Sequence, residues 1–426
     1  MPVDYAHPSG DKLNLAVIRL PASNRPSRIG SLIMNPGGPG GSGVDFLRGA
    51  ASHFPDEIRQ RFDLVSFDPR WVGRSQGLQC LSDSQQERFF AATSRAELLA
   101  TAAELAQACR PHMVALSHST TFDVARDLES LRAALGDRAI TYLGFSYGTL
   151  LGQAYAILFP SRIRAMALDG PVDPTLSWQD FDRGYADGFE EELEAFAAWC
   201  SKQNCPLGAS PAQVSAAVDA MVTRLNRTPQ VAGTRRLTGA LAIAGLLDGL
   251  LSEGGWPSLR EALRDLRGGD GGALLAMSDD WVGRDPSGHY DHRLEAYTAV
   301  SCSDRPYPKE MSAYDDAAQA AARSAPLFGA AITYGDLPCA FWPVHGAAWP
   351  QRPSGSTPIL IVGTTGDPAT PFAWARAVAG RLSHGVLLIH RGEGHTAYLG
   401  DDPCIERTVD RYLLAVSSPG SGLVCG

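Results

Sequence analysis

The sequence predicts an α/β protein, in which a mostly parallel sheet carries helices on both faces and is interrupted by a large helical insertion. Three observations favour this class. Short apolar stretches alternate with longer helical ones through residues 1–173. The alternation then stops, and residues 174–343 are mostly helical in composition, with glycine breaks. It resumes in residues 344–426, so we expect two distant parts of the chain to form one core beneath a helical lid.

Local patterns justify these elements in order. In the first part, apolar stretches predict strands over residues 13–20, 31–34, 62–67, 139–143 and 164–168, and helical composition predicts helices over residues 84–109, 121–135 and 149–159. Leu13, Leu15 and Val17 recur at every second position, as in a strand with one buried face. Gly136 and Pro160 follow two of the helices and stop them. The last part repeats the pattern, with strands over residues 358–362 and 386–389 and helices over residues 371–382 and 405–416.

The overall composition excludes several classes of partner. With 44% hydrophobic and 19% charged residues, the chain resembles an ordinary soluble globular protein. A net charge of −9 argues against nucleic acid or an anionic membrane as a partner. No stretch reaches the roughly 18 uncharged apolar residues of a membrane span, because the best candidate, residues 237–251, contains Asp248. We therefore expect neither a nucleic-acid nor a membrane partner, and the composition predicts no oligomeric state.

The motif Gly144-Phe145-Ser146-Tyr147-Gly148 lies between a predicted strand and a predicted helix. A serine on such a sharp turn has its hydroxyl exposed at the carboxyl end of the sheet, and the flanking glycines let strand and helix approach closely. We interpret Ser146 as a nucleophile. The alternative is an ordinary strand-to-helix turn.

A serine hydroxyl needs a base to take its proton and a further group to orient that base. With a serine on this kind of turn, the chain order is serine, then an acid, then histidine. Asp367 and His395 fit this order, since each follows a predicted strand through a glycine-rich loop. We predict that His395 is the base and Asp367 the orienting acid.

Other residues compete for these two roles. His384 and His390 lie near the same strand as His395, but neither is on the loop beyond it. Asp169 also ends a strand and is the alternative acid, although it could instead brace the loop into the insertion. Asp68 ends another strand, and we expect a structural role for it.

The glycine-rich stretch 35–43 is expected to stabilise the oxyanion of the acyl-transfer intermediate. One backbone donor should be the amide of Tyr147, and the other should come from the glycine loop. Because Pro39 has no N–H group, we favour Gly38. The alternative, a phosphate-binding loop, lacks the terminal Lys-Ser/Thr pair. This chemistry requires no cofactor and no metal.

Eight cysteines bear on the compartment of the protein. An even number favours disulfides and an oxidising environment, and the spacing of Cys200 and Cys205 suits a local loop closure. The alternatives are a zinc site, which lacks a second close pair of ligands, and free buried thiols in a cytosolic protein. Residues 1–5 have neither the basic start nor the apolar run of a signal peptide.

Together these motifs resemble the tripeptidyl-aminopeptidase-like serine hydrolases of actinobacteria, which have the α/β-hydrolase fold and are related to proline iminopeptidase. The resemblance is carried by residues 35–43, 144–149, 299–304, 366–371 and 392–396. It extends from residues 2–5, which resemble the first strand of the family, to Cys425 near the end.

The resemblance implies a secreted enzyme that removes short peptides or single residues from free amino termini. It makes Ser146 the nucleophile, Asp367 the acid and His395 the base, with Gly38 and Tyr147 as oxyanion donors. It also implies four disulfides, namely Cys80–Cys109, Cys200–Cys205, Cys302–Cys339 and Cys404–Cys425.

Two features depart from the family pattern. The chain starts inside the region of the first strand, which suggests a trimmed chain or a cytosolic relative. Trp71 also stands where the family has glycine. If that position has a positive φ, tryptophan costs on the order of 1–2 kcal/mol there. Alternatively, the ring lines the substrate cleft and narrows it.

The leading prediction is a serine hydrolase of peptide or amide bonds, with residues 174–343 limiting the length of the substrate. An aminopeptidase must hold a free ammonium group, so Glu190, Glu191 and Glu192 are candidate ligands for it; the alternative is a solvated helix face. A second reading is an esterase or amidase acting on a small molecule such as an antibiotic. A third is a catalytically inactive binding protein on the same fold.

Overall fold

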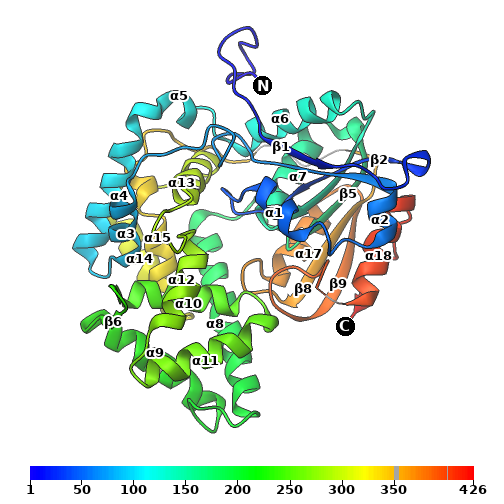
Figure 1. Ribbon diagram of the computed structural model, residues 1–426. Helices are drawn as coiled ribbons and strands as arrows, with labels where there is room; N and C mark the ends of the chain where they lie inside the picture. Colours follow the sequence, from blue (N-terminus) through cyan, green and yellow to red (C-terminus); the bar gives the residue numbers. More distant parts are fainter. Residues whose placement is uncertain (350–354, 401) are drawn as a thin grey trace.

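The computed structural model describes residues 1–349, 355–400 and 402–426, and its centre is an eight-stranded sheet (Figure 1). The strand order is β1-β3-β2-β4-β5-β8-β9-β10, in which β1 runs antiparallel to β3 and every other pairing is parallel. The strands are β1 (Val17–Leu20), β2 (Gly30–Asn35), β3 (Phe62–Phe67), β4 (Ile140–Phe145), β5 (Ile163–Asp169), β8 (Ile359–Gly366), β9 (Gly385–Glu393) and β10 (Leu423–Cys425).

Helices cover both faces of this sheet, as the sequence predicts. One face packs against α1 (Gly43–Ala50), α2 (Asp56–Arg61) and α18 (Pro403–Ala415), and the other against α6 (Thr121–Ala134), α7 (Tyr147–Leu158) and α17 (Phe372–Arg381). Successive side chains of β2 point to opposite faces of the sheet. Leu32 and Met34 pack with α1, α2 and α18, whereas Ile33 packs with α6, α7 and α17. This alternation is the expected consequence of the period of two in a strand. The central strands β2, β3 and β4 are buried on both faces, as is typical of a parallel sheet.

The insertion between β5 and β8 is mostly helical and has a core of its own. Its elements are α8 (Trp178–Ser201), α9 (Pro211–Arg227), β6 (Gln230–Ala232), β7 (Arg235–Leu237), α10 (Gly239–Leu250), α11 (Trp256–Arg267), α12 (Gly272–Val282), α13 (Arg293–Asp304), α14 (Met311–Ala321), α15 (Gly329–Gly335) and α16 (Pro338–Phe341). Because β5 and β8 are neighbours in the sheet, the chain leaves and re-enters the core at adjacent positions. The small β6–β7 hairpin has no counterpart in the sequence-based prediction.

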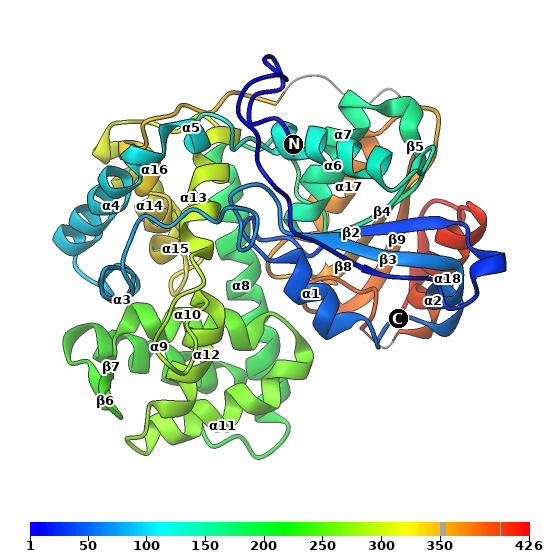
Figure 2. The same cartoon turned by 45° about the horizontal axis from the view of Figure 1, so that its top comes forward.

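Three helices from the first part of the chain lie with the insertion rather than on the sheet. They are α3 (Asp83–Ala91), α4 (Arg95–Cys109) and α5 (Met113–Leu116), and they stand beside α13 to α16 (Figure 1, Figure 2). Ala102 and Leu105 of α4 share core clusters with Trp178, Tyr314 and Cys302 of the insertion. We use the name cap for the insertion together with α3 to α5.

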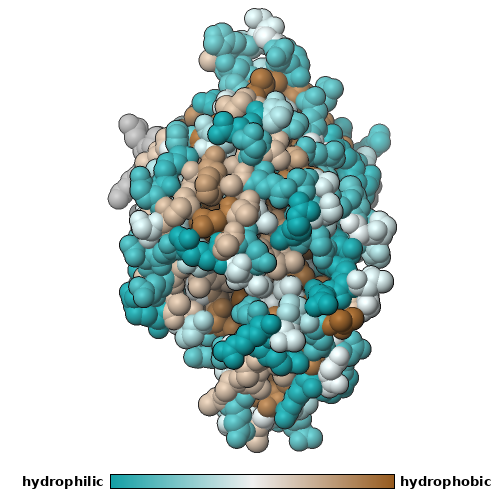
Figure 3. Space-filling model, turned by 90° about the vertical axis from the view of Figure 1, so that its left-hand side faces the viewer, coloured by the Kyte–Doolittle hydropathy of each residue, from teal (hydrophilic) through white to brown (hydrophobic). Residues whose placement is uncertain are grey.

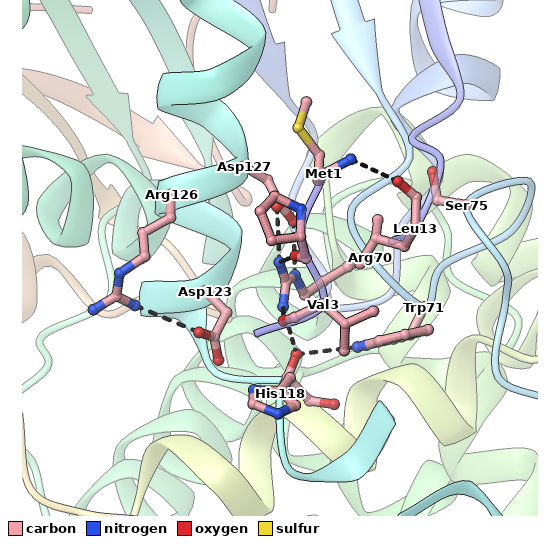
Figure 4. A network of polar contacts seen from close by, with 12 residues as sticks. Met1, Val3, Leu13, Arg70, Trp71, Ser75, His118, Asp123, Arg126 and Asp127 are labelled. Carbon is pink, nitrogen blue, oxygen red and sulfur yellow. Dashed lines mark hydrogen bonds and ion pairs between the residues drawn. The ribbon is translucent and has the colours of Figure 1, made fainter. Parts of the chain in front are cut away.

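The expected start of the sheet is wrong. Residues 2–5 form no strand, and Pro2 makes only an isolated bridge to Lys12. The buried guanidinium of Arg70 explains this, because it donates hydrogen bonds to the carbonyl oxygens of Pro2 (3.2 Å) and Val3 (3.0 Å) and forms an ion pair with Asp127 (Figure 4). These carbonyl groups are thus satisfied by a side chain, away from the sheet.

All eight cysteines form disulfides, in the pairing that the family resemblance implies: Cys80–Cys109, Cys200–Cys205, Cys302–Cys339 and Cys404–Cys425. The zinc and free-thiol alternatives are therefore wrong. Since such bonds persist in oxidising surroundings, they indicate an extracellular protein. In the part of the chain that the structure describes, no helix has both the length and the apolar character needed to cross a membrane. Hydrophilic residues also dominate the face of the cap that is turned to the viewer in Figure 3, with hydrophobic ones scattered among them.

Candidate active site

Ser146 occupies the sharp turn between β4 and α7, with φ 54° and ψ −124°. Its N–H donates to the carbonyl oxygen of Asp169 at the end of β5, 3.0 Å away. The flanking glycines are sterically required: a Cβ atom on Gly148 would lie 2.6 Å from the Asn35 carbonyl oxygen, and one on Gly144 would lie 2.6 Å from the Gly148 carbonyl carbon. The sequence motif thus produces a strained, partly exposed position for the serine at the carboxyl end of a central strand.

His395 and Asp367 lie together at the same edge of the sheet. Asp367 follows β8 directly, His395 follows β9, and the His395 Nδ1 atom lies 2.9 Å from Asp367 Oδ1 and 3.0 Å from Oδ2. A carboxylate accepts only, so Nδ1 carries the proton and Nε2 is left as the basic nitrogen.

The chain holds the Asp367 carboxylate in a fixed orientation. It accepts hydrogen bonds from the amides of Ala369 (2.9 Å) and Thr370 (2.8 Å) and from the Thr370 hydroxyl (2.9 Å). The Thr370 hydroxyl also lies 3.4 Å from His395 Nδ1. Thr370 is a site residue that the sequence-based reasoning missed, although it stands only three positions after Asp367.

The imidazole of His395 lies beside Gly170, just past the end of β5. A Cβ atom on Gly170 would lie 2.9 Å from His395 Cε1, and Gly170 follows the residue whose carbonyl binds the Ser146 amide. Burial lowers the pKa of the imidazole, but the negative charge and the hydrogen bond of Asp367 outweigh it, and the pKa lies above its usual value. Ser146 and His395 line one cavity of about 900 Å³ that lies under the cap.

Asp169 has a different role from Asp367. Its buried carboxylate accepts hydrogen bonds from the amides of Ala397 (3.0 Å) and Tyr398 (2.8 Å), which follow His395 in the chain. Burial raises the pKa of Asp169 to about 6. It therefore braces the loop that carries the histidine, while the ring itself is bonded to Asp367.

Asp68 is also structural, as expected. It accepts from the Ser42 hydroxyl at 2.6 Å and from the amides of Val44 (3.1 Å) and Arg74 (3.0 Å), so it fixes the loop at the start of α1.

The glycine loop passes directly beside the nucleophile. Gly37, Gly38 and Gly40 all have positive φ, and the Gly38–Pro39 peptide bond is cis. A Cβ atom on Gly37 would lie 2.8 Å from the Ser146 Cβ atom and 3.3 Å from the Tyr147 amide nitrogen. Gly38 lines the cavity together with Ser146. Tyr147 is the first residue of α7, and the first N–H groups of a helix have no acceptor within the helix, so its amide is available as a donor.

The side chain of Tyr147 points into a buried network away from the cavity. Its hydroxyl lies 2.7 Å from the Thr121 hydroxyl, and Thr121 donates to both carboxylate oxygens of Asp304, through its hydroxyl at 2.5 Å and its amide at 2.9 Å. Asp304 ends α13, so this network joins the cap to the helix that follows the nucleophile. Only the three-dimensional contact reveals it, because these residues are far apart in the sequence.

Trp71 lies outside the residues that line the cavity. Its φ is 66°, and its indole N–H donates to the His118 carbonyl oxygen at 3.1 Å (Figure 4). The ring packs against a core cluster that includes Leu78 and Leu294. The sequence left two interpretations of Trp71 open, a tryptophan with a positive φ or a ring that lines the substrate cleft. The positive φ supports the first of these.

The three adjacent glutamates of α8 do not line the cavity either. Glu190 accepts a hydrogen bond from the Leu327 amide at 3.1 Å, and Glu191 is exposed. Glu192 is buried, and burial together with the charges of Glu393 and Asp367 raises its pKa to about 9. The acidic residues that do line the cavity are Asp182, Asp219, Asp248, Asp280 and Asp336. Each stands outside any recognisable motif, so no local pattern singles these aspartates out.

The chain is similar over its full length to known hydrolases. Residues 325–425 match the family described as TAP-like protein. Tripeptidyl aminopeptidase from Streptomyces coelicolor is 31% identical, and the match covers 100% of this chain and 82% of that protein. This chain belongs to the tripeptidyl-aminopeptidase-like family of α/β-hydrolases. It is a serine hydrolase, as the sequence predicts.

Two further relatives are more similar to this chain than that enzyme is. Serine protease Hip1 from Mycobacterium tuberculosis (strain H37Rv) is 38% identical, with 100% of this chain and 86% of that protein covered. Carboxylesterase B from the same strain is 37% identical, with 100% and 85% covered. The names of these relatives thus include both peptidases and an esterase.

Proposed function

We propose that the protein is an exo-aminopeptidase, which releases short peptides or single residues from free amino termini through Ser146, His395 and Asp367. The observation that carries the proposal is the bond from His395 Nδ1 to Asp367, because it leaves Nε2 as a base in the cavity that Ser146 also lines. Relatives named as a serine protease and a tripeptidyl aminopeptidase support a peptide substrate.

In this mechanism, the Ser146 hydroxyl attacks the substrate carbonyl carbon while His395 Nε2 takes its proton. The resulting oxyanion accepts hydrogen bonds from the Tyr147 and Gly38 amides. His395 then gives the proton to the leaving amine, and an acyl group remains on Ser146. Water, deprotonated by the same nitrogen, releases the acyl group and restores the enzyme. Asp367 stabilises the imidazolium that forms twice in this cycle.

The cap supports an exopeptidase rather than a protease that cuts in the middle of proteins. It covers the serine and leaves a cavity of about 900 Å³, which is within the usual range for small-ligand sites. We infer that it admits one end of a chain and that residues 174–343 act as the lid. The four disulfides fit a secreted enzyme that works outside the cell.

Arylamides of single amino acids and of tripeptides, each with a free or an acetylated amino terminus, test this function. We expect cleavage of the free forms and a loss of several orders of magnitude in Ser146→Ala. Labelling of Ser146 by a fluorophosphonate probe in the wild type, and none in the variant, would place the nucleophile. Absence of labelling in folded protein would support the inactive binding protein instead.

An esterase or amidase of small molecules is the second candidate, because Carboxylesterase B is 37% identical to this chain. The same residues would cleave an ester by the same steps. Equal cleavage of free and acetylated arylamides, together with faster cleavage of acyl esters, would favour this candidate over the exopeptidase.

A further inference from the structure

The cap helix α13 touches both parts of the chain that would supply the oxyanion donors. Its first turns lie against the glycine loop, because a Cβ atom on Gly40 would lie 2.8 Å from the Arg293 carbonyl oxygen and 3.3 Å from the Tyr297 amide nitrogen. Its middle touches the nucleophile turn, since Val300 shares a core cluster with Tyr147. One helix of the cap therefore borders both sides of the place where the oxyanion would form.

The end of α13 reaches the same turn through a chain of hydrogen bonds. Asp304, its last residue, accepts from the Thr121 hydroxyl at 2.5 Å and from the Thr121 amide at 2.9 Å, and the Tyr147 hydroxyl lies 2.7 Å from the Thr121 hydroxyl. Burial raises the pKa of Asp304 to about 6, so its carboxyl group is mainly ionised at pH 7 and only accepts. The single hydroxyl proton of Thr121 therefore goes to Asp304, and Tyr147 donates its own proton to Thr121.

This chain of hydrogen bonds is shielded from solvent and fully paired. Thr121 is 0% exposed, Tyr147 4% and Asp304 8%, and both hydroxyl groups and both carboxylate oxygens have a partner. Positions 297, 300 and 304 are spaced as i, i+3 and i+7, so all the contacts of α13 with the site lie on one face of the helix. A buried network with every group satisfied holds its members in one arrangement.

Tyr147 is the residue of the nucleophile turn that connects to the cap in this way. Its neighbours are held from within the core, because the Thr149 hydroxyl donates to the Ser146 carbonyl oxygen at 2.6 Å and the Tyr142 hydroxyl to the Gly148 carbonyl oxygen at 2.8 Å. The side chain of Tyr147 is fixed at its far end by Thr121 instead. Since a displacement of about 1 Å in a catalytic group can cost about 100-fold in rate, this anchor matters for the amide of the same residue.

We propose that Asp304 and Thr121 are positioning residues of the oxyanion hole, which hold the Tyr147 amide in place through the Tyr147 hydroxyl. This inference rests on the acyl-transfer mechanism of the proposed function, although not on the type of substrate, because an oxyanion forms in ester and amide cleavage alike. Neither Thr121 nor Asp304 lines the cavity. The network therefore acts on the transition state and leaves the binding of the substrate unchanged.

Paired variants of Thr121 test the link, since Thr121→Val removes the hydroxyl but keeps the shape, and Thr121→Ser keeps the hydroxyl. In Thr121→Val we expect kcat for an arylamide and for p-nitrophenyl butyrate to fall by about 10-fold or more, with KM changed by no more than about twofold. Thr121→Ser should stay within about twofold of the wild type. The inhibition constant of a peptidyl trifluoromethyl ketone, which places an anionic oxygen in the hole, should rise by the same factor as kcat falls.

Tyr147→Phe breaks the same link from its other end. It removes one oxygen atom and keeps the ring and the amide. We expect the same loss of kcat as in Thr121→Val, and the double variant should lose little more than either single one, because both substitutions remove one connection.

Thr298→Val is the matched control in the same helix. Thr298 is buried, and its hydroxyl donates to the Leu294 carbonyl oxygen at 2.8 Å, within α13. It does not line the cavity. This variant should lose thermal stability, as Thr121→Val does, and keep kcat and KM at the wild-type level.

The outcomes separate this inference from the proposed function. If Thr121→Val and Tyr147→Phe lose stability but keep wild-type kcat, or if Thr298→Val loses as much kcat as they do, the network is merely structural and the inference is overturned. A loss confined to KM also overturns it. A wild type that cleaves esters or acetylated arylamides as well as free peptides contradicts the aminopeptidase, while the expected losses in ester hydrolysis still support the positioning role. A wild type that hydrolyses neither substrate contradicts both, and should Thr121→Val not fold, Tyr147→Phe gives the same comparison.

Discussion

At the residue scale, the pKa of His395 links the geometry of the site to a measurable pH dependence. The base must be neutral to accept the serine proton, so activity falls as the pH drops through the imidazole pKa. Asp367 raises that pKa above its usual value. The acidic limb of kcat/KM is therefore expected above pH 6.5, the ordinary value for histidine.

Asp367→Asn removes the negative charge that raises the pKa of His395. We expect the acidic limb to move to lower pH and kcat to fall about 10⁴-fold, because the imidazolium loses its stabilising partner and the ring its tautomer. The pH profile of kcat/KM for the variant and the wild type measures both effects. Asp169→Asn is a useful comparison, since Asp169 bonds the backbone beyond the histidine. A profile unchanged by Asp367→Asn would contradict the assignment of the acid.

A substitution at Trp71 should lower the stability of the protein without changing its substrate binding. In Trp71→Phe the aromatic packing is retained, and the hydrogen bond to the His118 carbonyl oxygen is lost. We expect the free energy of unfolding to fall by about 1 kcal/mol, the usual contribution of one such bond. Because Trp71 does not line the cavity, KM for every substrate should stay unchanged. Denaturant unfolding and steady-state kinetics test the two halves of the prediction, and a changed KM would place the ring in the substrate path.

At the element scale, the glycine loop must come close to the nucleophile turn. Gly37 has φ 106°, and a Cβ atom there would lie 2.8 Å from both the Phe145 carbonyl oxygen and the Ser146 Cβ atom. Gly37→Ala therefore has to move the loop away from Ser146. We expect kcat to fall by about 10²–10³, the usual effect of losing one oxyanion donor, with a smaller change in KM.

A matched control for Gly37→Ala is Gly49→Ala in α1, where an added Cβ atom meets nothing within 4 Å. This variant should keep wild-type kinetics and be as stable or slightly more so, since alanine favours the helix. Equal kcat in both variants would show that the loop does not supply an oxyanion donor.

The elements that carry the site could be predicted because their signals are local. The strand Phe62–Phe67 has the predicted bounds, and the strands and helices around Ser146, Asp367 and His395 lie within a few residues of the prediction. Local patterns could not reveal that α3 and α4 join the cap, nor that Ala102 and Leu105 of α4 share core clusters with Tyr314 and Cys302. Those facts depend on contacts between segments more than 100 residues apart in the sequence.

At the scale of the whole molecule, the cap meets the core across a group of acids. Glu192 on α8 lies near Glu393 at the end of β9. The negative charges of Glu393, Asp367 and Glu253 all raise the pKa of Glu192. Burial and these charges raise its pKa to about 9, so it is neutral at pH 7 in the folded protein. In the unfolded chain it ionises near its ordinary pKa of about 4.3. Between these two values the folded state holds one more proton than the unfolded state, and the contribution of Glu192 to stability falls as the pH rises.

Glu192→Gln removes this titration while preserving size and shape. We therefore expect the variant to gain stability relative to the wild type as the pH increases from 5 to 9, by on the order of a few kcal/mol at the upper end. Urea unfolding at several pH values measures the difference, and Glu191→Gln, at the exposed neighbouring position, is the control for the loss of one charge. Because Glu192 lies where the cap meets the loop that carries His395, the stabilised variant should also keep its activity to higher pH. If the free energy of unfolding changes with pH in the same way in the wild type and in Glu192→Gln, the Glu192 carboxyl group is accessible to water. The cap and the core would then not be packed closely together at this position.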